Sequence, residues 1–93
     1  MIKTFKDTAT EQIFHGGKPK SLPADIHRTA YRKLVQIYAS SSLQDLHIPP
    51  GNRLEALKGD LGGLYSIRIN AQWRICFSWH DGHAYDVHIS DYH

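Results

Sequence analysis

The fold of this protein is decided by the stretch from Leu64 to His80, which reads LYSIRINAQWRICFSWH. Apolar and polar residues alternate over residues 64–70 and again over residues 73–80. Alternation with a period of two is typical of β-strands that bury one face. The polar stretch between the two runs predicts a turn at residues 70–72. The sequence therefore places an antiparallel hairpin at the centre of a sheet.

The register of the strands follows from parity, because cross-strand neighbours share one face of a sheet. A three-residue turn pairs Arg68 with Arg74, and a loop over residues 80–82 would pair Arg74 with His88 on a final strand at 85–90. We therefore expect Arg68, Arg74 and His88 to form one polar row across three strands. Adjacent arginines favour a bound anion between them. The alternative is that both side chains extend into solvent or pair with a nearby aspartate.

The residues before position 50 carry helical signals. Thr8 and Glu11 have the spacing of a capping box, which predicts a short helix over residues 8–15. A second helix is expected to open at Pro23, because apolar residues then recur at helical spacing: Ile26, Ala30, Leu34 and Ile37. A short strand is expected over residues 53–57. Two N-terminal helices packed on a twisted antiparallel sheet make an α+β domain.

The composition excludes several classes of protein. The chain has 93 residues, of which 41% are hydrophobic and 22% are charged, and this predicts a single domain over residues 1–93. The mean hydropathy is -0.45, and we therefore expect no run of about 20 apolar residues that could span a membrane. The lone cysteine Cys76 cannot form an internal disulfide, and the opening residues 1–6 lack the apolar core of a secretory signal. We therefore expect a cytoplasmic protein without a membrane partner.

No standard nucleotide-binding or metal-binding motif is present in the sequence. His83, His88 and His93 are spaced by five, which places successive residues on opposite faces of a strand, so no metal site is expected. Cys76 is interpreted as a packed residue rather than a nucleophile. Lys58 would lie at the end of the short strand, where its ammonium group could reach the polar face of the sheet.

The last three residues combine a carboxylate, a phenol and an imidazole in Asp91, Tyr92 and His93. Cleavage of RNA by transesterification needs a base for the 2′-hydroxyl proton, a cation for the phosphorane and an acid for the leaving 5′-oxygen. The terminus supplies an acid and a base, positive charge could come from Arg68, Arg74 and Lys58, and Tyr92 could stack on a base. The alternative is that Tyr92 only anchors the final strand.

These residues resemble a known family, the HigB toxins of bacterial toxin-antitoxin modules in the RelE/ParE superfamily. The resemblance spans the whole chain. It is carried by PPGNRLEALKGD at residues 49–60, YSIRIN at 65–70, QWRICF at 72–77 and the terminal Asp-Tyr-His at 91–93. The resemblance implies a RelE-like fold and the toxin of a type II toxin-antitoxin system.

The activity that the resemblance implies is a ribosome-dependent endoribonuclease that cleaves mRNA in the ribosomal A site without a metal or cofactor. Catalytic roles then go to Lys58, Arg74, Asp91, Tyr92, His93 and Glu55. Asp91 or Glu55 would be the base and His93 the acid, with Lys58 and Arg74 stabilising the phosphorane and Tyr92 stacking on a base. Some family members have a histidine at the Glu55 position, which leaves the choice of base open. The expected RNA-binding residues are Arg68, Arg53, Arg28, Arg32 and Lys33.

The resemblance also implies two macromolecular partners. One is a HigA-type helix-turn-helix antitoxin, and the toxin-antitoxin complex would bind operator DNA only through this antitoxin. The other is the ribosome with mRNA in its A site. The main alternative keeps the fold and changes the activity to a ParE-like, non-catalytic poison of DNA gyrase. Lys58 and the Asp91–His93 terminus favour the ribonuclease, since a gyrase poison has no chemical need for them. A non-catalytic RNA-binding module is the third alternative.

Overall fold

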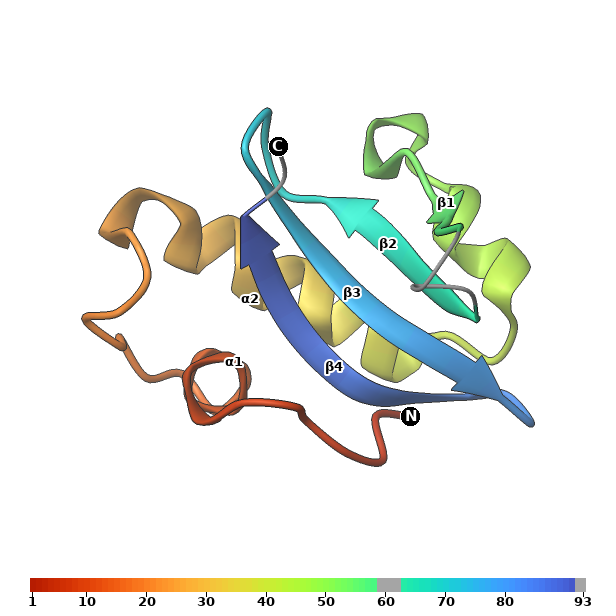
Figure 1. Cartoon of the computed structure of the whole chain (residues 1–93), viewed down its shortest axis with the longest axis horizontal. Helices are drawn as coiled ribbons and strands as arrows, with labels where there is room; N and C mark the ends of the chain where they lie inside the picture. Colours follow the sequence, from red (N-terminus) through yellow and green to blue (C-terminus); the bar gives the residue numbers. More distant parts are fainter. Residues whose placement is uncertain (59–62, 92–93) are drawn as a thin grey trace.

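The structure is a computed structural model that describes residues 1–58 and 63–91. Within these residues two helices precede a four-stranded antiparallel sheet (Figure 1), which confirms the predicted α+β class. The helices are α1 (Thr8–Phe14) and α2 (Ala24–Ala39), with short 3-10 helices η1 (Leu43–His47) and η2 (Pro50–Asn52). The strands are β1 (Glu55–Ala56), β2 (Leu64–Arg68), β3 (Trp73–His80) and β4 (His83–Asp91), in the spatial order β1-β2-β3-β4. None of the described helices is long and apolar enough to cross a membrane.

Helix α1 begins at residue 8, as the sequence pattern predicts, but its N-cap is a different residue. Asp7 is the N-cap, and its Oδ1 accepts a hydrogen bond from the backbone N–H of Thr10 at 2.8 Å. The predicted capping box of Thr8 and Glu11 is therefore wrong, because Thr8 is the first helical residue and Asp7, one residue earlier, is the N-cap. Thr10 is fully buried, and its Oγ1 accepts from the backbone N–H of Ile89, which ties α1 to β4.

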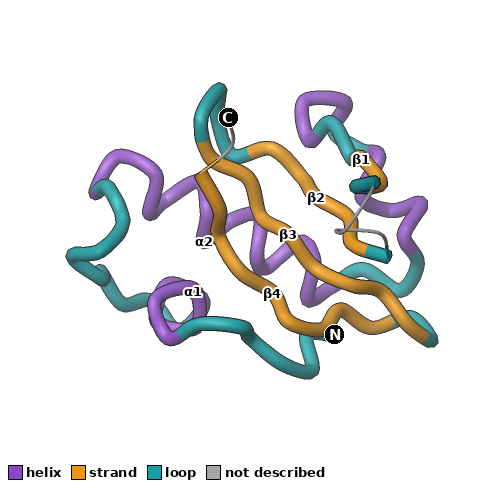
Figure 2. The backbone as a smooth tube through the Cα atoms, in the orientation of Figure 1, coloured by secondary structure: helices purple, strands orange, loops and turns teal. Residues whose placement is uncertain are grey.

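The core lies between α2 and one face of the sheet. Figure 2 shows α2 running behind the strands, with α1 beside β4. The predicted apolar stripe of α2 is confirmed, since Ile26, Ala30, Leu34 and Ile37 are all at most 1% exposed. Ile67, Ile75 and Phe77 face it from the sheet and are fully buried. Burial of these side chains holds the central hairpin in one register.

The hairpin of β2 and β3 has the predicted register. Arg68 lies opposite Arg74, and the backbone N–H of Ile69 donates to the Trp73 carbonyl at 2.9 Å. Asn70 makes the turn, because its Oδ1 accepts from the backbone N–H groups of both Gln72 and Trp73 at 2.8 Å. A side chain that bonds to the backbone two and three residues ahead stabilises a tight turn.

The register of β3 and β4 differs from the prediction. A two-residue turn pairs His80 with His83, Cys76 lies opposite His88, and Ser90 rather than His88 lies opposite Arg74. The predicted row of Arg68, Arg74 and His88 is therefore wrong.

The extra residue that parity requires is a β-bulge in β4 and not part of the turn. Asp86 and Val87 together lie opposite Phe77, and Asp86 has a positive φ of 53°. Aspartate tolerates this conformation better than most residues. The bulge returns Val87 to the buried face while Asp86 stays exposed.

Candidate functional site

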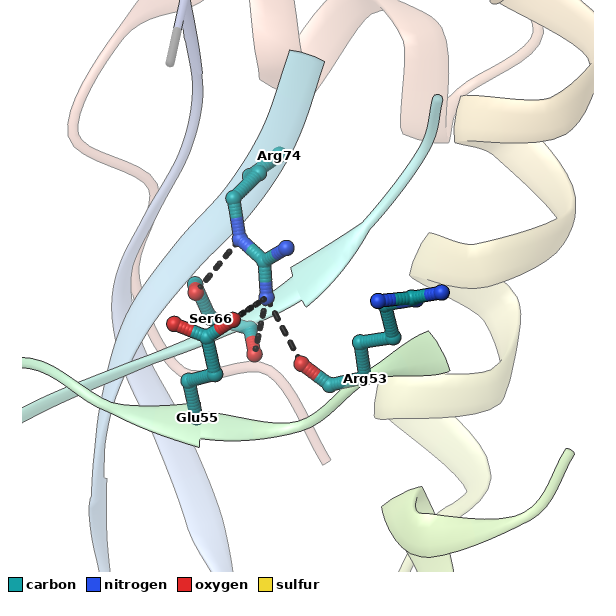
Figure 3. A network of polar contacts seen from close by, with 4 residues as sticks. All are labelled: Arg53, Glu55, Ser66 and Arg74. Atoms are coloured by element: carbon teal, nitrogen blue, oxygen red, sulfur yellow. Dashed lines mark hydrogen bonds and ion pairs between the residues drawn. The ribbon is translucent and has the colours of Figure 1, made fainter. Parts of the chain in front are cut away.

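The guanidinium group of Arg74 is the centre of a polar network with Arg53, Glu55 and Ser66 (Figure 3). Its Nε donates to Ser66 Oγ at 2.8 Å, and its Nη2 donates to the carbonyl oxygens of Arg53 at 2.7 Å and Ser66 at 3.3 Å. Glu55 Oε1 lies 3.7 Å from the same Nη2. Arg74 is only 5% exposed, so these contacts act in a region of reduced screening by water.

Strand pairing explains why these residues meet. The short strand β1 pairs with β2 so that Glu55 lies opposite Ser66, and β2 pairs with β3 so that Ser66 lies opposite Cys76. Arg74 stands two residues along β3 from Cys76, and its long side chain reaches across to both Ser66 and Glu55. Arg53 lies two residues before β1 and has left-handed backbone dihedrals, with φ 45° and ψ 55°. Its carbonyl group, rather than its guanidinium group, faces Arg74 (Figure 3).

A cavity of about 250 Å³ opens beside this network. Its lining residues are Arg53, Glu55, Arg68, Asn70, Ala71 and Arg74. Three guanidinium groups and one carboxylate give the cavity a formal charge of +2. Arginine-rich cavities bind phosphate through charge-assisted hydrogen bonds, so the site favours a phosphodiester. The same cavity holds a carboxylate that can accept a proton, which is the pairing that a phosphoryl-transfer site requires.

Lys58 and Asp91 lie outside the lining of this cavity. Lys58 is exposed and follows β1 by two residues. Asp91 ends β4 opposite Trp73, and its Oδ2 accepts from Gln72 Nε2 at 3.1 Å. Tyr92 and His93 lie outside the described residues. The structure thus brings together Arg53, Glu55, Arg68 and Arg74 among the predicted site residues, at one end of the sheet.

The cations of α2 divide into two groups. Arg28 and Arg32 are exposed, as the helical pattern predicts. Lys33 was predicted to face outward, and this is wrong, because it is only 8% exposed. It stands three residues after Ala30 and four before Ile37, on the buried stripe itself. Burial, followed by the charge of the neighbouring Arg32, lowers the pKa of Lys33 below its ordinary value.

Cys76 and Ser66 occupy the same polar face as Arg74, and both are buried. Burial raises the pKa of the Cys76 thiol, with the charges of Arg74 and Lys6 opposing the effect. A protonated and buried thiol is a poor nucleophile, in agreement with the interpretation of Cys76 as a packed residue. Sequence reasoning did not identify Ser66 as a support for Arg74. Its only signal is a hydroxyl on the polar side of a strand next to an arginine-bearing strand.

A larger cavity of about 400 Å³ lies between the end of α1 and the first half of α2. Its lining residues are Ile13, Gly16, Gly17, Lys18, Ala24, His27, Arg28 and Tyr31. No carboxylate is among these lining residues, and the only imidazole, His27, already contacts the Leu22 carbonyl through Nε2 at 3.0 Å. The smaller cavity beside Arg74 is therefore the better candidate for acid–base chemistry.

Comparison with known proteins identifies the family. Residues 3–93 match the family model of HigB-like toxins, described as the RelE-like toxin of the type II toxin-antitoxin system HigB. The chain is 42% identical over 90 residues to Toxin HigB-1 of Vibrio cholerae, covering 96% of this chain and 95% of that protein. It is 36% identical over 94 residues to Endoribonuclease HigB of Proteus vulgaris, covering both chains fully.

A solved structure shares the fold at lower identity. A chain of the YoeB-YefM complex from Staphylococcus aureus superposes with a TM-score of 0.61 at 20% identity, over 100% of this chain and 98% of the other. The match to the family model and the two relatives agree with the resemblance seen in the sequence. The chain therefore belongs to the HigB-like family of RelE-like toxins of type II toxin-antitoxin systems.

Proposed function

We propose that this chain is an endoribonuclease that cleaves mRNA in the ribosomal A site and thereby stops translation. The observation that carries the proposal is the Arg74 guanidinium, held 3.7 Å from Glu55 beside a cavity with two further arginines. A relative that matches the full length of this chain is named Endoribonuclease HigB, which supports the same reaction here.

The proposed reaction is an intramolecular transesterification. Glu55 accepts the 2′-hydroxyl proton, the 2′-oxygen bonds to the adjacent phosphorus, and the bond from phosphorus to the 5′-oxygen breaks. Arg74 and Lys58 stabilise the negative charge of the phosphorane, and His93 protonates the leaving 5′-oxygen. The products carry a 2′,3′-cyclic phosphate and a 5′-hydroxyl. No water, metal or cofactor enters this balance.

Glu55 is the preferred base because it is the carboxylate that lines the cavity beside Arg74. Asp91 is the alternative base, and its hydrogen bond to Gln72 would have to be exchanged for one to the RNA. Tyr92 is proposed to stack on a base of the codon, and Arg53 and Arg68 to bind the neighbouring phosphates.

The small size of the site supports the proposed dependence on the ribosome. A cavity of about 250 Å³ is smaller than a typical ligand pocket and offers little surface on which to extend and unstack an RNA strand. A ribosome already presents the codon extended in its A site, which lowers the entropic cost of in-line geometry. The exposed Arg28 and Arg32 of α2 are proposed to contact ribosomal RNA.

The family supplies the proposal for the remaining partners. A HigA-type helix-turn-helix antitoxin would neutralise this toxin, and the complex would bind operator DNA through the antitoxin alone. Ribosomes and messenger RNA place the proposed activity in the cytoplasm.

The function is tested by inducing the chain in growing cells and mapping the new 5′ ends of messenger RNA. The proposal predicts in-frame cuts confined to translated messages, and their loss when the start codon of a reporter message is removed. The variant Arg74→Lys, expressed to the same level, provides the inactive control. DNA damage with intact messages would overturn the proposal and support a gyrase poison.

A further inference from the structure

Lys33 is a charged residue that α2 buries, with no charged partner among the described residues. Its Nζ donates to Asn52 Oδ1, and Asn52 is fully buried. Among residues 1–58 and 63–91, no carboxylate lies within ion-pair distance of Lys33. A buried ammonium group is costly unless it is hydrogen-bonded, so the position would be filled better by an apolar residue if packing were its only purpose.

The contacts of Asn52 determine the orientation of its amide. The Nδ2 group donates to Gln36 Oε1 at 3.0 Å, to the Leu46 carbonyl at 3.2 Å and to the Ile48 carbonyl at 3.4 Å. Lys33 can only donate and the backbone carbonyls can only accept, so a flipped amide would leave both sides unsatisfied. Asn52 therefore joins α2 to the loop of η1 and η2 in one defined geometry.

Asn52 is the residue directly before Arg53, and this places the anchor next to the candidate site. Arg53 has left-handed backbone dihedrals, and its carbonyl accepts from Arg74 Nη2 at 2.7 Å. Glu55 follows two residues later and contacts the same nitrogen. A continuous series of contacts thus runs from Lys33 through Asn52 and Arg53 to the guanidinium group of Arg74.

We propose that Lys33 and Asn52 are positioning residues that hold the Arg53 carbonyl, and through it the Arg74 guanidinium, in the geometry that RNA cleavage needs. Neither side chain touches the RNA. The functional half of this inference rests on the proposed ribonuclease activity, and the geometric half concerns only the orientation of Arg74. Loss of the anchor lets the loop before β1 relax, and a small displacement of a catalytic group lowers the rate of the chemical step.

The test compares Lys33→Met with the wild type by two measurements. Methionine keeps an unbranched stem of similar length and removes the donor, and burial of a neutral side chain is expected to preserve folding. The control is Lys20→Met, which changes an exposed lysine outside the site. The first measurement is single-turnover cleavage on programmed ribosomes as a function of toxin concentration. The second is the NMR resonance of the Arg74 Nε–H, assigned by its disappearance in Arg74→Lys and recorded without ribosomes.

The inference predicts that Lys33→Met lowers the maximal cleavage rate about tenfold, leaves the half-saturating concentration within about twofold, and shifts the Arg74 Nε–H resonance. Lys20→Met changes neither measurement. The inference would be overturned if Lys33→Met kept the maximal cleavage rate of the wild type, whether or not its half-saturating concentration rose. It would also be overturned if the Arg74 Nε–H resonance of Lys33→Met did not shift.

Two further outcomes are also decisive. If Lys33→Met does not fold, Lys33→Gln, whose amide ends one bond short of the ammonium position, is judged by the same two measurements. If the wild type does not cleave RNA, the proposed function fails, and the Arg74 resonance alone decides the geometric half: a shift in Lys33→Met retains it, and no shift overturns it.

Discussion

Substitution of Arg74 by lysine tests how much of this site is held by the guanidinium fork rather than by positive charge. The Nε and Nη2 atoms of Arg74 donate to two separate acceptors, Ser66 Oγ and the Arg53 carbonyl. A lysine has one nitrogen and cannot satisfy both acceptors. The variant Arg74→Lys therefore loses at least one hydrogen bond from a charged group and leaves a buried acceptor without its donor.

The expected cost is the net contribution of one such bond, about 1.5–3 kcal/mol. In a domain of this size, that corresponds to a decrease in Tm of roughly 6–24 °C. The matched control for stability is Arg68→Lys, which makes the same chemical change directly across the hairpin from Arg74. Arg68 is half-buried and makes no side-chain hydrogen bond to the described residues, so its substitution should cost about 0.5 kcal/mol or less.

The assay is urea unfolding followed by tryptophan fluorescence, with the free energies of the two variants compared under the same conditions. A larger cost for Arg74→Lys than for Arg68→Lys, by at least about 1 kcal/mol, supports the network. Equal losses of unfolding free energy at the two positions would show that the hydrogen bonds of the Arg74 guanidinium group do not stabilise the protein. The reasoning about the site would then be refuted.

Three further predictions concern other residues. Glu55→Gln should lower ribosome-dependent cleavage about 10²- to 10⁴-fold, the range for a general base, whereas Glu11→Gln on α1 should cleave at the wild-type rate; similar rates for both variants would exclude Glu55 as the base. Cys76, whose thiol pKa is raised by burial, should react with a thiol-specific reagent at pH 7.5 only after unfolding in urea, and rapid labelling of the native protein would contradict its assignment as a packed residue. The backbone N–H groups of Ser41 and Ser42 lower the pKa of Asp45, so the stability that they contribute is present above the ordinary aspartate pKa and is lost as pH falls through the lowered value. Asp45→Asn should reduce this loss of stability in unfolding measurements from pH 6 to pH 2. An unchanged pH dependence of the unfolding free energy would argue against this role of Asp45.

The sequence predicted those elements of the fold whose pattern of apolar residues is visible within a single short segment. The alternation over residues 64–70 and 73–80 predicted the central hairpin, and Asn70 provides the turn between its strands. Helix α2 was predicted because four apolar residues recur along one stripe. In each case the same pattern serves both local structure and burial, so no competing arrangement satisfies it as well.

The register of β4 was not predictable in the same way. Parity correctly required one extra residue between Trp73 and Ile89, but it did not say where that residue lies. A turn at Asp81-Gly82 and a bulge at Asp86 satisfy parity as well as a three-residue loop does. The positive φ values of Asp81 and Asp86 depend on the whole hairpin, and aspartate occurs at ordinary positions too often to mark a bulge by itself.

The sequence analysis named the charged residues that line the candidate cavity, but not the residues that hold them in place. Arg68, Arg74, Arg53 and Glu55 follow from strand pairing and from the family motif. The charge of Lys33 predicts an exposed side chain, but its position falls on the apolar stripe of α2, and the residue is buried. A lysine at a buried helical position signals a polar partner elsewhere in the fold, and that partner is visible only once the loop before β1 is placed against α2.

The most direct measurement of the central claim is single-turnover cleavage of a defined message on purified ribosomes, with the cut position and the chemical ends of the products determined. Wild-type protein is expected to cut within the A-site codon and leave a 2′,3′-cyclic phosphate and a 5′-hydroxyl, and folded Arg74→Lys is expected to lose most of this activity. An intact message with the wild type, or full cleavage by Arg74→Lys, would contradict the assignment of RNA cleavage to the cavity beside Arg74.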